Sequence, residues 1–195
     1  MKVSLELRPS KIHKGGIGAF ALVNFKKGQK VAGGISRKDY EDIIPWEIFK
    51  RYPSHIRKKV IDFCIGTQKG FIPPEGGDFN NLSVEWCFNH SCDGNLGFDK
   101  NGDFIARKNI RKGDEISFDY GLADSNPAYR LKCECRSKNC RKVITGNDWK
   151  DPGYRKKQSK YLLHVLKEYD HSKVENTGRA QGAAIKVKPR KTGGK

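Results

Sequence analysis

The chain has 195 residues, 36% of them hydrophobic and 31% charged, which suits one domain of ordinary size followed by a tail. We expect neither a transmembrane helix nor a secretory signal, because no apolar run reaches about 18 residues and the first segment is not apolar. The formal net charge of +17 favours a polyanionic partner, and the last 45 residues carry 12 basic and 4 acidic side chains. The plainer interpretation is a solvated surface with a basic tail.

Short apolar segments interrupted by glycines fill residues 1–35 and predict a β-rich start. The next segment differs, because its apolar residues recur with a spacing near 3.6 between Ile56 and Cys64. This spacing predicts an amphipathic helix that begins after Pro53 and Ser54.

The middle of the chain, residues 84–120, returns to short strands. Residues 84–88 form the first expected strand of this region. An Asn-Gly pair lies between Phe98 and Phe104, and such a pair between apolar residues is typical of a β-hairpin turn. A third strand is expected within residues 112–121.

Beyond the middle region, residues 154–169 place their apolar side chains on one helical face and predict a C-terminal helix. From residue 172 onward the composition turns to small and basic residues with almost no large apolar groups. That segment is therefore expected to be a disordered tail.

Six cysteines are present, and three of them form a C-x-C-x4-C segment at Cys133, Cys135 and Cys140. Clustered thiols in a reducing compartment favour a metal over disulfides. Three thiolates need a fourth ligand to close a tetrahedron around zinc, and Cys92 is a natural donor. Such a site is structural, because four thiolates leave no open position. The alternative is a loop of thiols that bind no metal.

The glycine cluster at residues 15–18 contains a formal G-x-G-x-x-A pattern. A dinucleotide-binding interpretation needs a helix there, whereas a strand and a turn follow, so a tight turn is the plainer alternative. The pair Asn89 and His90 could meet the polar part of a cofactor. A cysteine hydrolase with His90 and Cys92 is disfavoured, because side chains so close in sequence rarely face each other. Tyr120, next to Gly121, is by itself most often a packed aromatic.

Four segments in this order resemble the SET domain of protein-lysine methyltransferases: GGIGAFA, FNHSCDGNLGF, IRKGDEISFDYG and, as a post-SET zinc motif, KCECRSKNC. The resemblance covers about residues 3–146 and is similar to the short stand-alone SET proteins of bacteria and viruses. It implies a mainly β fold with a few helices, in which the NHSC segment is threaded in a knot-like arrangement. The domains expected on this basis are a SET domain at 1–122 with an insert at about 36–82, a post-SET zinc segment at 123–150, a C-terminal helix at 151–171 and a basic disordered tail at 172–195.

The same resemblance implies an S-adenosylmethionine-dependent protein-lysine N-methyltransferase with a structural zinc ion. Tyr120 would be the catalytic tyrosine, and Phe118 would line the substrate channel and favour more than one methyl transfer. The residues implied to bind the cofactor are Gly16, Ile17, Gly18, Asn89, His90 and Tyr120, and those implied to bind zinc are Cys92, Cys133, Cys135 and Cys140.

The sequence departs from the family pattern at two places. Residues 31–34 lack the aromatic that commonly lines the lysine channel, and Tyr40 or Tyr129 could take its place. Gly94 stands where a proline is usual, which we expect to matter little.

The expected substrate is a lysine-containing segment of a histone-like or other nucleic-acid-associated protein, with residues near Leu131 and Trp149 as further walls of the lysine site. The charge of the basic tail indicates that it could bind nucleic acid. The expected location is cytoplasmic or nucleoid-associated, or the host nucleus for a chain from a pathogen or virus. The alternative function is a non-catalytic, zinc-stabilised basic module that binds chromatin or nucleic acid.

Overall fold

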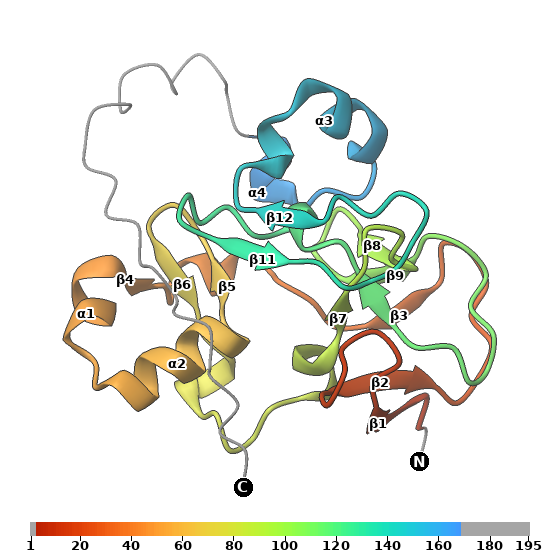
Figure 1. The fold of residues 1–195 in the computed structure, drawn as a ribbon, viewed down its shortest axis with the longest axis horizontal. Coiled ribbons are helices and arrows are strands. Elements are labelled where there is room, and N and C mark those ends of the chain that lie inside the picture. The colour runs from red at the N-terminus through yellow and green to blue at the C-terminus, as the bar shows by residue number, and fades with distance from the viewer. Residues whose placement is uncertain (1–2, 169–195) are drawn as a thin grey trace, which may run out of the picture.

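The computed structural model describes residues 3–168, which form a mainly β fold with a few short helices (Figure 1). Most strands are two to five residues long, as expected where glycines and prolines interrupt the apolar segments. The strands are β1 (Leu5–Pro9), β2 (Ile17–Ala21), β3 (Lys30–Ala32), β4 (Ile44–Pro45), β5 (Ile65–Gly66), β6 (Gly70–Ile72), β7 (Asn89–His90), β8 (Leu96–Phe98), β9 (Phe104–Ala106), β10 (Ser117–Phe118), β11 (Arg130–Lys132) and β12 (Val143–Thr145). The α-helices are α1 (Trp46–Arg51), α2 (Ser54–Phe63), α3 (Pro152–Gln158) and α4 (His164–Lys167). The 3-10 helices are η1 (Lys38–Tyr40), η2 (Glu75–Gly77), η3 (Val84–Cys87), η4 (Tyr120–Leu122) and η5 (Asp148–Lys150).

The central sheet has five strands in the order β3-β9-β8-β10-β7. Strand β10 runs parallel to both of its neighbours, with Phe118 opposite His90 on one side and Leu96 on the other. The chain therefore brings residues 89–98 around the short strand that precedes Tyr120. This arrangement agrees with the predicted threading of the NHSC segment.

The predicted hairpin is confirmed as β8 and β9, with Phe98 directly opposite Phe104. Gly102 has a φ of +89° in the turn, a left-handed conformation that side chains other than glycine disfavour. The expected strand at 84–88 is wrong, because residues 84–87 form the 3-10 helix η3. The N–H groups of Trp86 and Phe88 donate to carbonyls three residues back, so this segment satisfies its backbone locally.

The insert forms a layer of its own at the left of Figure 1, where α1 and α2 accompany the small sheet β4-β6-β5. The predicted helix after Pro53 is confirmed as α2. Val60 of this helix is fully buried, whereas Ile61 is exposed. Among the helices of residues 3–168, none is long and apolar enough to cross a membrane.

The prediction of one helix over 154–169 is wrong. Helix α3 ends at Gln158, and a turn separates it from α4. The turn buries Leu162 and Leu163, and the Leu163 N–H donates to the Leu122 carbonyl. Burial against η4 therefore outweighs the helical spacing. The expected tail at 172–195 lies outside the described residues, and the domain bounds remain predictions.

Candidate active site and metal centre

A row of aromatic rings leads through the core to Tyr120. The ring centroids of Phe98 and Phe104 lie 4.6 Å apart, those of Phe104 and Phe118 5.1 Å, and those of Phe118 and Tyr120 4.9 Å. The Tyr120 hydroxyl donates to the Phe88 carbonyl at 3.1 Å. Burial raises the pKa of Tyr120 well above its usual value, so the group stays a neutral phenol. Tyr120 can therefore orient a ligand by hydrogen bonding, and it is a poor base.

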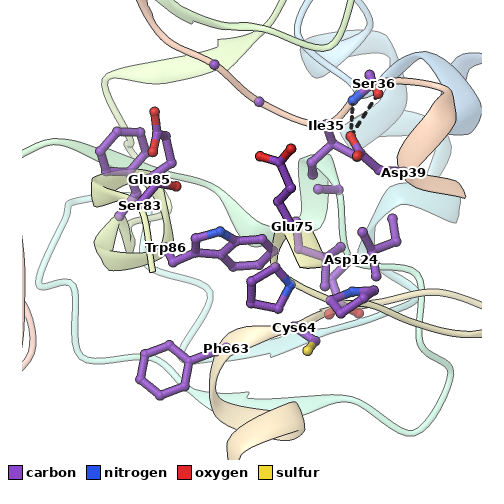
Figure 2. A pocket seen from close by; sticks show the side chains of 18 of the residues that line it. Ile35, Ser36, Asp39, Phe63, Cys64, Glu75, Ser83, Glu85, Trp86 and Asp124 are labelled. Carbon is purple, nitrogen blue, oxygen red and sulfur yellow. Dashed lines mark hydrogen bonds between the residues drawn. The ribbon is translucent and has the colours of Figure 1, made fainter. Parts of the chain in front are cut away.

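A cavity of about 860 Å³ opens beside this row, between the central sheet and the insert (Figure 2). Phe118, Tyr120 and Tyr129 line it, so the structure brings the two predicted channel residues together with one of the two candidate replacement aromatics. Tyr40 is not among the lining residues.

Residues near Leu131 and Trp149 were expected to wall this site, and Tyr129, close to Leu131 in the sequence, does line the cavity. Leu131 and Trp149 themselves do not line it. Trp149 is fully buried in the main core, and Leu131 packs against the cysteine cluster.

The cavity also contains a carboxylate that sequence reasoning missed. Asp124 lines it, and the carboxylate accepts the backbone N–H groups of Gly66 and Asn126 at 3.1 and 3.0 Å. Burial raises the pKa of Asp124 to about 7, although these two hydrogen bonds oppose the shift. A single aspartate in a loop gave no sequence signal, because only the fold brings residues 66 and 124 together.

The predicted cofactor residues of the glycine cluster meet Asn89 at a separate place, outside the lining of the large cavity. The Asn89 amide nitrogen donates to the Ile17 carbonyl at 2.9 Å and to Glu115 at 3.1 Å. A Cβ on Gly18 would lie 2.3 Å from Glu115 Oε1, so a larger residue there would displace the carboxylate that Asn89 contacts. No described hydrogen bond uses the side-chain amide oxygen of Asn89. Ile17 beside it is 58% exposed, whereas a Cβ on Gly16 would lie 2.4 Å from the His13 ring. An exposed residue next to an available amide oxygen fits a polar group of an adenosyl amino acid.

The ring of His90, by contrast, is directed inward. Its Nδ1 accepts the Tyr120 N–H at 3.1 Å, and its Nε2 lies 3.4 Å from Cys92 Sγ. The residue is 5% exposed, and burial lowers its pKa to about 4, so the ring is neutral at pH 7. Cofactor contacts at this position, as predicted from the sequence, would therefore involve the backbone of His90.

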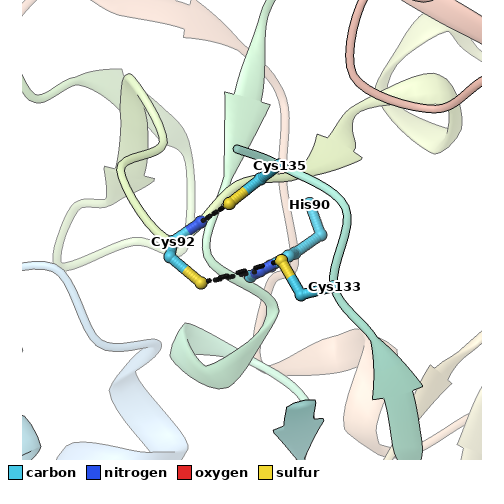
Figure 3. Close-up of side chains that lie close together, drawn as sticks. All are labelled: His90, Cys92, Cys133 and Cys135. Carbon is cyan, nitrogen blue, oxygen red and sulfur yellow. Dashed lines mark hydrogen bonds between the residues drawn. The ribbon is translucent and has the colours of Figure 1, made fainter. Parts of the chain in front are cut away.

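Three of the four predicted zinc ligands lie together, and within residues 3–168 the four-membered group is His90, Cys92, Cys133 and Cys135 (Figure 3). Their ligand atoms all lie within 4.8 Å of one another. The Sγ atoms of Cys92 and Cys133 are 3.8 Å apart, and a tetrahedral zinc with bonds of about 2.3 Å requires a separation of about 3.8 Å. The residues present therefore fit a zinc ion.

Cys140, the fourth predicted ligand, packs in the same cluster, although its sulfur is not within the compact group. The hydrogen bonds of His90 favour Cys140 over the imidazole as the ligand. A neutral ring that accepts the Tyr120 N–H at Nδ1 carries its proton on Nε2, so Nε2 donates toward Cys92 and has no lone pair for a metal. Backbone N–H groups of Arg141 and Lys142 approach the sulfurs of Cys92 and Cys140 at 3.3 and 3.4 Å, as suits thiolates.

Arg141, a second residue that sequence reasoning missed, joins the cysteine segment to the segment that carries Tyr120. Its guanidinium donates two hydrogen bonds of 2.6 Å to Asp119, which is completely buried, and one of 3.1 Å to Asp148. A bidentate pair of this kind fixes orientation as well as distance. The cysteine segment is therefore tied to the residue directly before Tyr120.

Known proteins are similar to parts of this chain. The family model described as "SET domain" matches residues 16–121. A Caenorhabditis briggsae protein named "Probable histone-lysine N-methyltransferase set-23" is 39% identical over 107 residues, which cover 50% of this chain and 42% of the relative. A solved structure of a humanized mutant of the Chaetomium thermophilum Polycomb Repressive Complex 2, bound to the inhibitor GSK126, is similar with 22% identity and a TM-score of 0.45. That match covers 63% of this chain and 15% of the other, so the chain spans less than half the length of either protein.

Proposed function

The chain belongs to the SET-domain family, and from this premise we propose that it is a protein-lysine N-methyltransferase that uses S-adenosylmethionine. The observation that carries the proposal is the arrangement around Tyr120. A buried, neutral phenol lies in a cavity with aromatic walls, while Asn89 and the glycine edge lie at a separate place. Two reactants can thus approach from different sides, as methyl transfer between a cofactor and a protein side chain requires.

The cofactor, when bound, supplies a methyl group already activated on a sulfonium. The task of the protein is to present the lysine as a neutral amine, because the ammonium form has no lone pair and a free lysine has a pKa of about 10.4. Aromatic walls at Phe104, Phe118 and Tyr129 disfavour the charged form by desolvation. The Tyr120 hydroxyl is in place to orient the amine. Phe118, which has no hydroxyl, leaves room for an amine that already carries a methyl group.

Cofactor binding is assigned to Gly16, Ile17, Gly18 and Asn89, with the backbone of His90. The zinc ion, held by four thiolates, has a structural role, since no ligand position stays open for chemistry. Burial raises the pKa of Cys92 to about 11, so a cation is needed to keep such a thiol deprotonated at neutral pH. Through Arg141 and Asp119, the cluster then supports the position of Tyr120.

The charge of the cavity supports a basic protein segment as the substrate. The chain is strongly basic, yet the residues of 3–168 that line the cavity include seven carboxylates and one cation, Lys38. Lys30 pairs with one of these carboxylates and Lys58 with another. Glu75 extends into the space in Figure 2, and one buried oxygen of Glu85 has no hydrogen-bond partner within residues 3–168. The lining carboxylates are Asp39, Asp42, Asp62, Glu75, Glu85, Asp103 and Asp124.

An acidic recess in a basic molecule attracts lysine and arginine side chains locally, even though the long-range field repels them. A histone-like segment has the matching charge. The relative named above is described as a histone-lysine methyltransferase, which supports the same substrate class.

The test is transfer of a labelled methyl group from S-adenosylmethionine to core histones and to a synthetic peptide of residues 181–195, QGAAIKVKPRKTGGK. We expect label on lysine in at least one of them, and calorimetric binding of the cofactor. The Tyr120→Phe variant should bind the cofactor normally and lose turnover by about 100-fold or more. A wild-type chain that binds DNA but not S-adenosylmethionine would reject the proposal and support the non-catalytic binding module instead.

A further inference from the structure

Asp124 lines the cavity, and the proposed role of Tyr120, which is to orient the substrate amine, gives no function to this carboxylate. The Asp124 N–H donates to the Tyr120 carbonyl at 2.8 Å, so the two residues lie on adjoining turns of the same segment. Both line the cavity, together with Tyr129. The charge of Asp124 contributes to the raised pKa values of Tyr120, Tyr129 and Tyr40.

The carboxylate is held in this position by the backbone. One oxygen accepts the Gly66 N–H and the other accepts the Asn126 N–H. A Cβ on Gly66 would come within 2.9 Å of the Asp124 carboxylate and 2.6 Å of Asn126, so glycine permits the close approach. Each carboxylate oxygen can accept about two hydrogen bonds. Capacity therefore remains for a donor that enters from the cavity.

No ion pair within residues 3–168 neutralises Asp124. Exposed carboxylates commonly lack partners, but this one is only partly exposed, at the wall of the cavity beside β5. A partly buried carboxylate without an ion pair favours a cationic ligand that enters the cavity. The ligand that the proposed function delivers there is a lysine ammonium.

Resting on the proposed function, we propose that Asp124 is a catalytic residue that receives the substrate ammonium and removes its proton before methyl transfer. The step moves one proton from the lysine Nζ to an Asp124 oxygen. The N–H bond breaks and its electron pair stays on nitrogen, while a new O–H bond forms. An ammonium and a carboxylate become an amine and a carboxylic acid, so charge balances without a further reactant. The proton then passes to water in the open part of the cavity.

The tyrosines and the cysteine that face Asp124 do not exchange a proton near pH 7. Tyr40 on η1, Tyr120 on η4 and Tyr129 all have pKa values raised by burial, and burial raises the pKa of Cys64, beside β5, to about 12. They stay neutral at pH 7. The other acids and the one cation of the lining are Asp39, Asp42, Asp62, Glu75, Glu85, Asp103 and Lys38. The pKa of about 7 for Asp124 suits a group that must both accept and release a proton near neutral pH.

The experiment is the pH dependence of kcat for wild type, Asp124→Asn and Asp124→Glu, with core histones and the 181–195 peptide as substrates. We expect Asp124→Asn to lose about 100-fold in kcat at pH 7. The deficit should shrink towards pH 10, where lysine in solution deprotonates unaided. Asp124→Glu should recover part of the loss. The control is Glu47→Gln, which removes an exposed carboxylate outside the cavity lining and should leave the kcat profile unchanged.

A structural role gives a different pattern. If Asp124→Asn lowered kcat by the same factor at every pH, or left the wild-type profile intact, the proposal would be overturned. Calorimetry with S-adenosylmethionine separates a folding defect, because an intact variant keeps the wild-type affinity. Failure of the proposed function is a separate result, since it would appear as a wild-type chain that transfers no methyl group to either substrate.

Discussion

Replacing Arg141 with glutamine should strongly destabilise the fold, because it leaves Asp119 charged and buried. Wild-type Asp119 is fully inaccessible and accepts two guanidinium hydrogen bonds of 2.6 Å. After the substitution, Asp119 keeps the Gly121 N–H at 3.1 Å, and the Tyr154 hydroxyl lies nearby within the described residues. Breaking a buried pair from one side costs about 3–5 kcal/mol. We expect the lower end, since the Arg141 side chain is 26% exposed and water can replace part of it.

The assay is urea unfolding at constant free zinc, because metal binding adds to the apparent stability. With a slope of about 2 kcal/mol per molar urea, a loss of 3 kcal/mol lowers the midpoint by about 1.5 M. Arg37→Gln is the matched control, since Arg37 forms a two-pronged pair with Glu168 in which both side chains are more than half exposed. That variant should keep the wild-type midpoint.

A double variant, Arg141→Gln with Asp119→Asn, should recover part of the loss because it removes the orphaned charge. The reasoning is refuted if Arg141→Gln costs less than about 1 kcal/mol, or if it behaves as the exposed control does. Strict additivity in the double variant would also count against it, since residues in direct contact are expected to couple.

Three further predictions concern metal, pH and substrate charge. Cys133→Ser should lose the zinc that wild type retains on dialysis, as measured by atomic absorption. Cys64→Ser, which lies outside the cysteine cluster, should retain the zinc. Equal zinc retention in the two variants would contradict the zinc site. The folded-state pKa of Asp124 exceeds its ordinary value of 3.8, so its contribution to stability is full at acid pH and is lost as pH rises from about 4 through 7. Urea titrations should therefore show wild type losing up to about 4 kcal/mol more than Asp124→Asn over that range, and parallel curves would refute this. Glu75→Gln should raise KM for the 181–195 peptide about fivefold and make KM less sensitive to salt. Glu47→Gln, which is exposed and away from the cavity, should change neither. Equal KM values for the two variants would contradict substrate attraction by the lining carboxylates.

The sequence was most informative where several weak patterns occur in a required order. No single segment among the glycine cluster, the NHSC segment, Tyr120 and the cysteines is decisive, yet their order predicted the family and the β-rich fold. The hairpin turn at Gly102 was predicted for a local reason, because its backbone conformation depends on the residue itself. Cys92 as a partner of the C-x-C-x4-C segment was predicted from ligand counting.

The strand predicted at 84–88 failed for a local reason, because its backbone forms 3-10 hydrogen bonds in η3. The single C-terminal helix failed for a long-range reason, because Leu163 is buried against η4. Asp124 and Arg141 gave no signal, since one acid or one arginine in a loop looks like an ordinary solvated residue. Only the fold shows that one is enclosed in a cavity and that the other pairs with a buried carboxylate.

The parallel pairing of β10 with β7 and β8 has a consequence for biosynthesis. Phe118 must be synthesised before His90 and Leu96 can find their partners, so the centre of the sheet cannot assemble while only the first half of the chain has left the ribosome. Gly94 packs closely against the backbone of β10, since a Cβ at residue 94 would lie 2.6 Å from the Phe118 Cα. Contacts so distant in sequence form slowly, and the nascent chain would meanwhile expose its aromatic residues. Recombinant yield should therefore improve at low temperature or slow translation, whatever the net stability of the finished molecule.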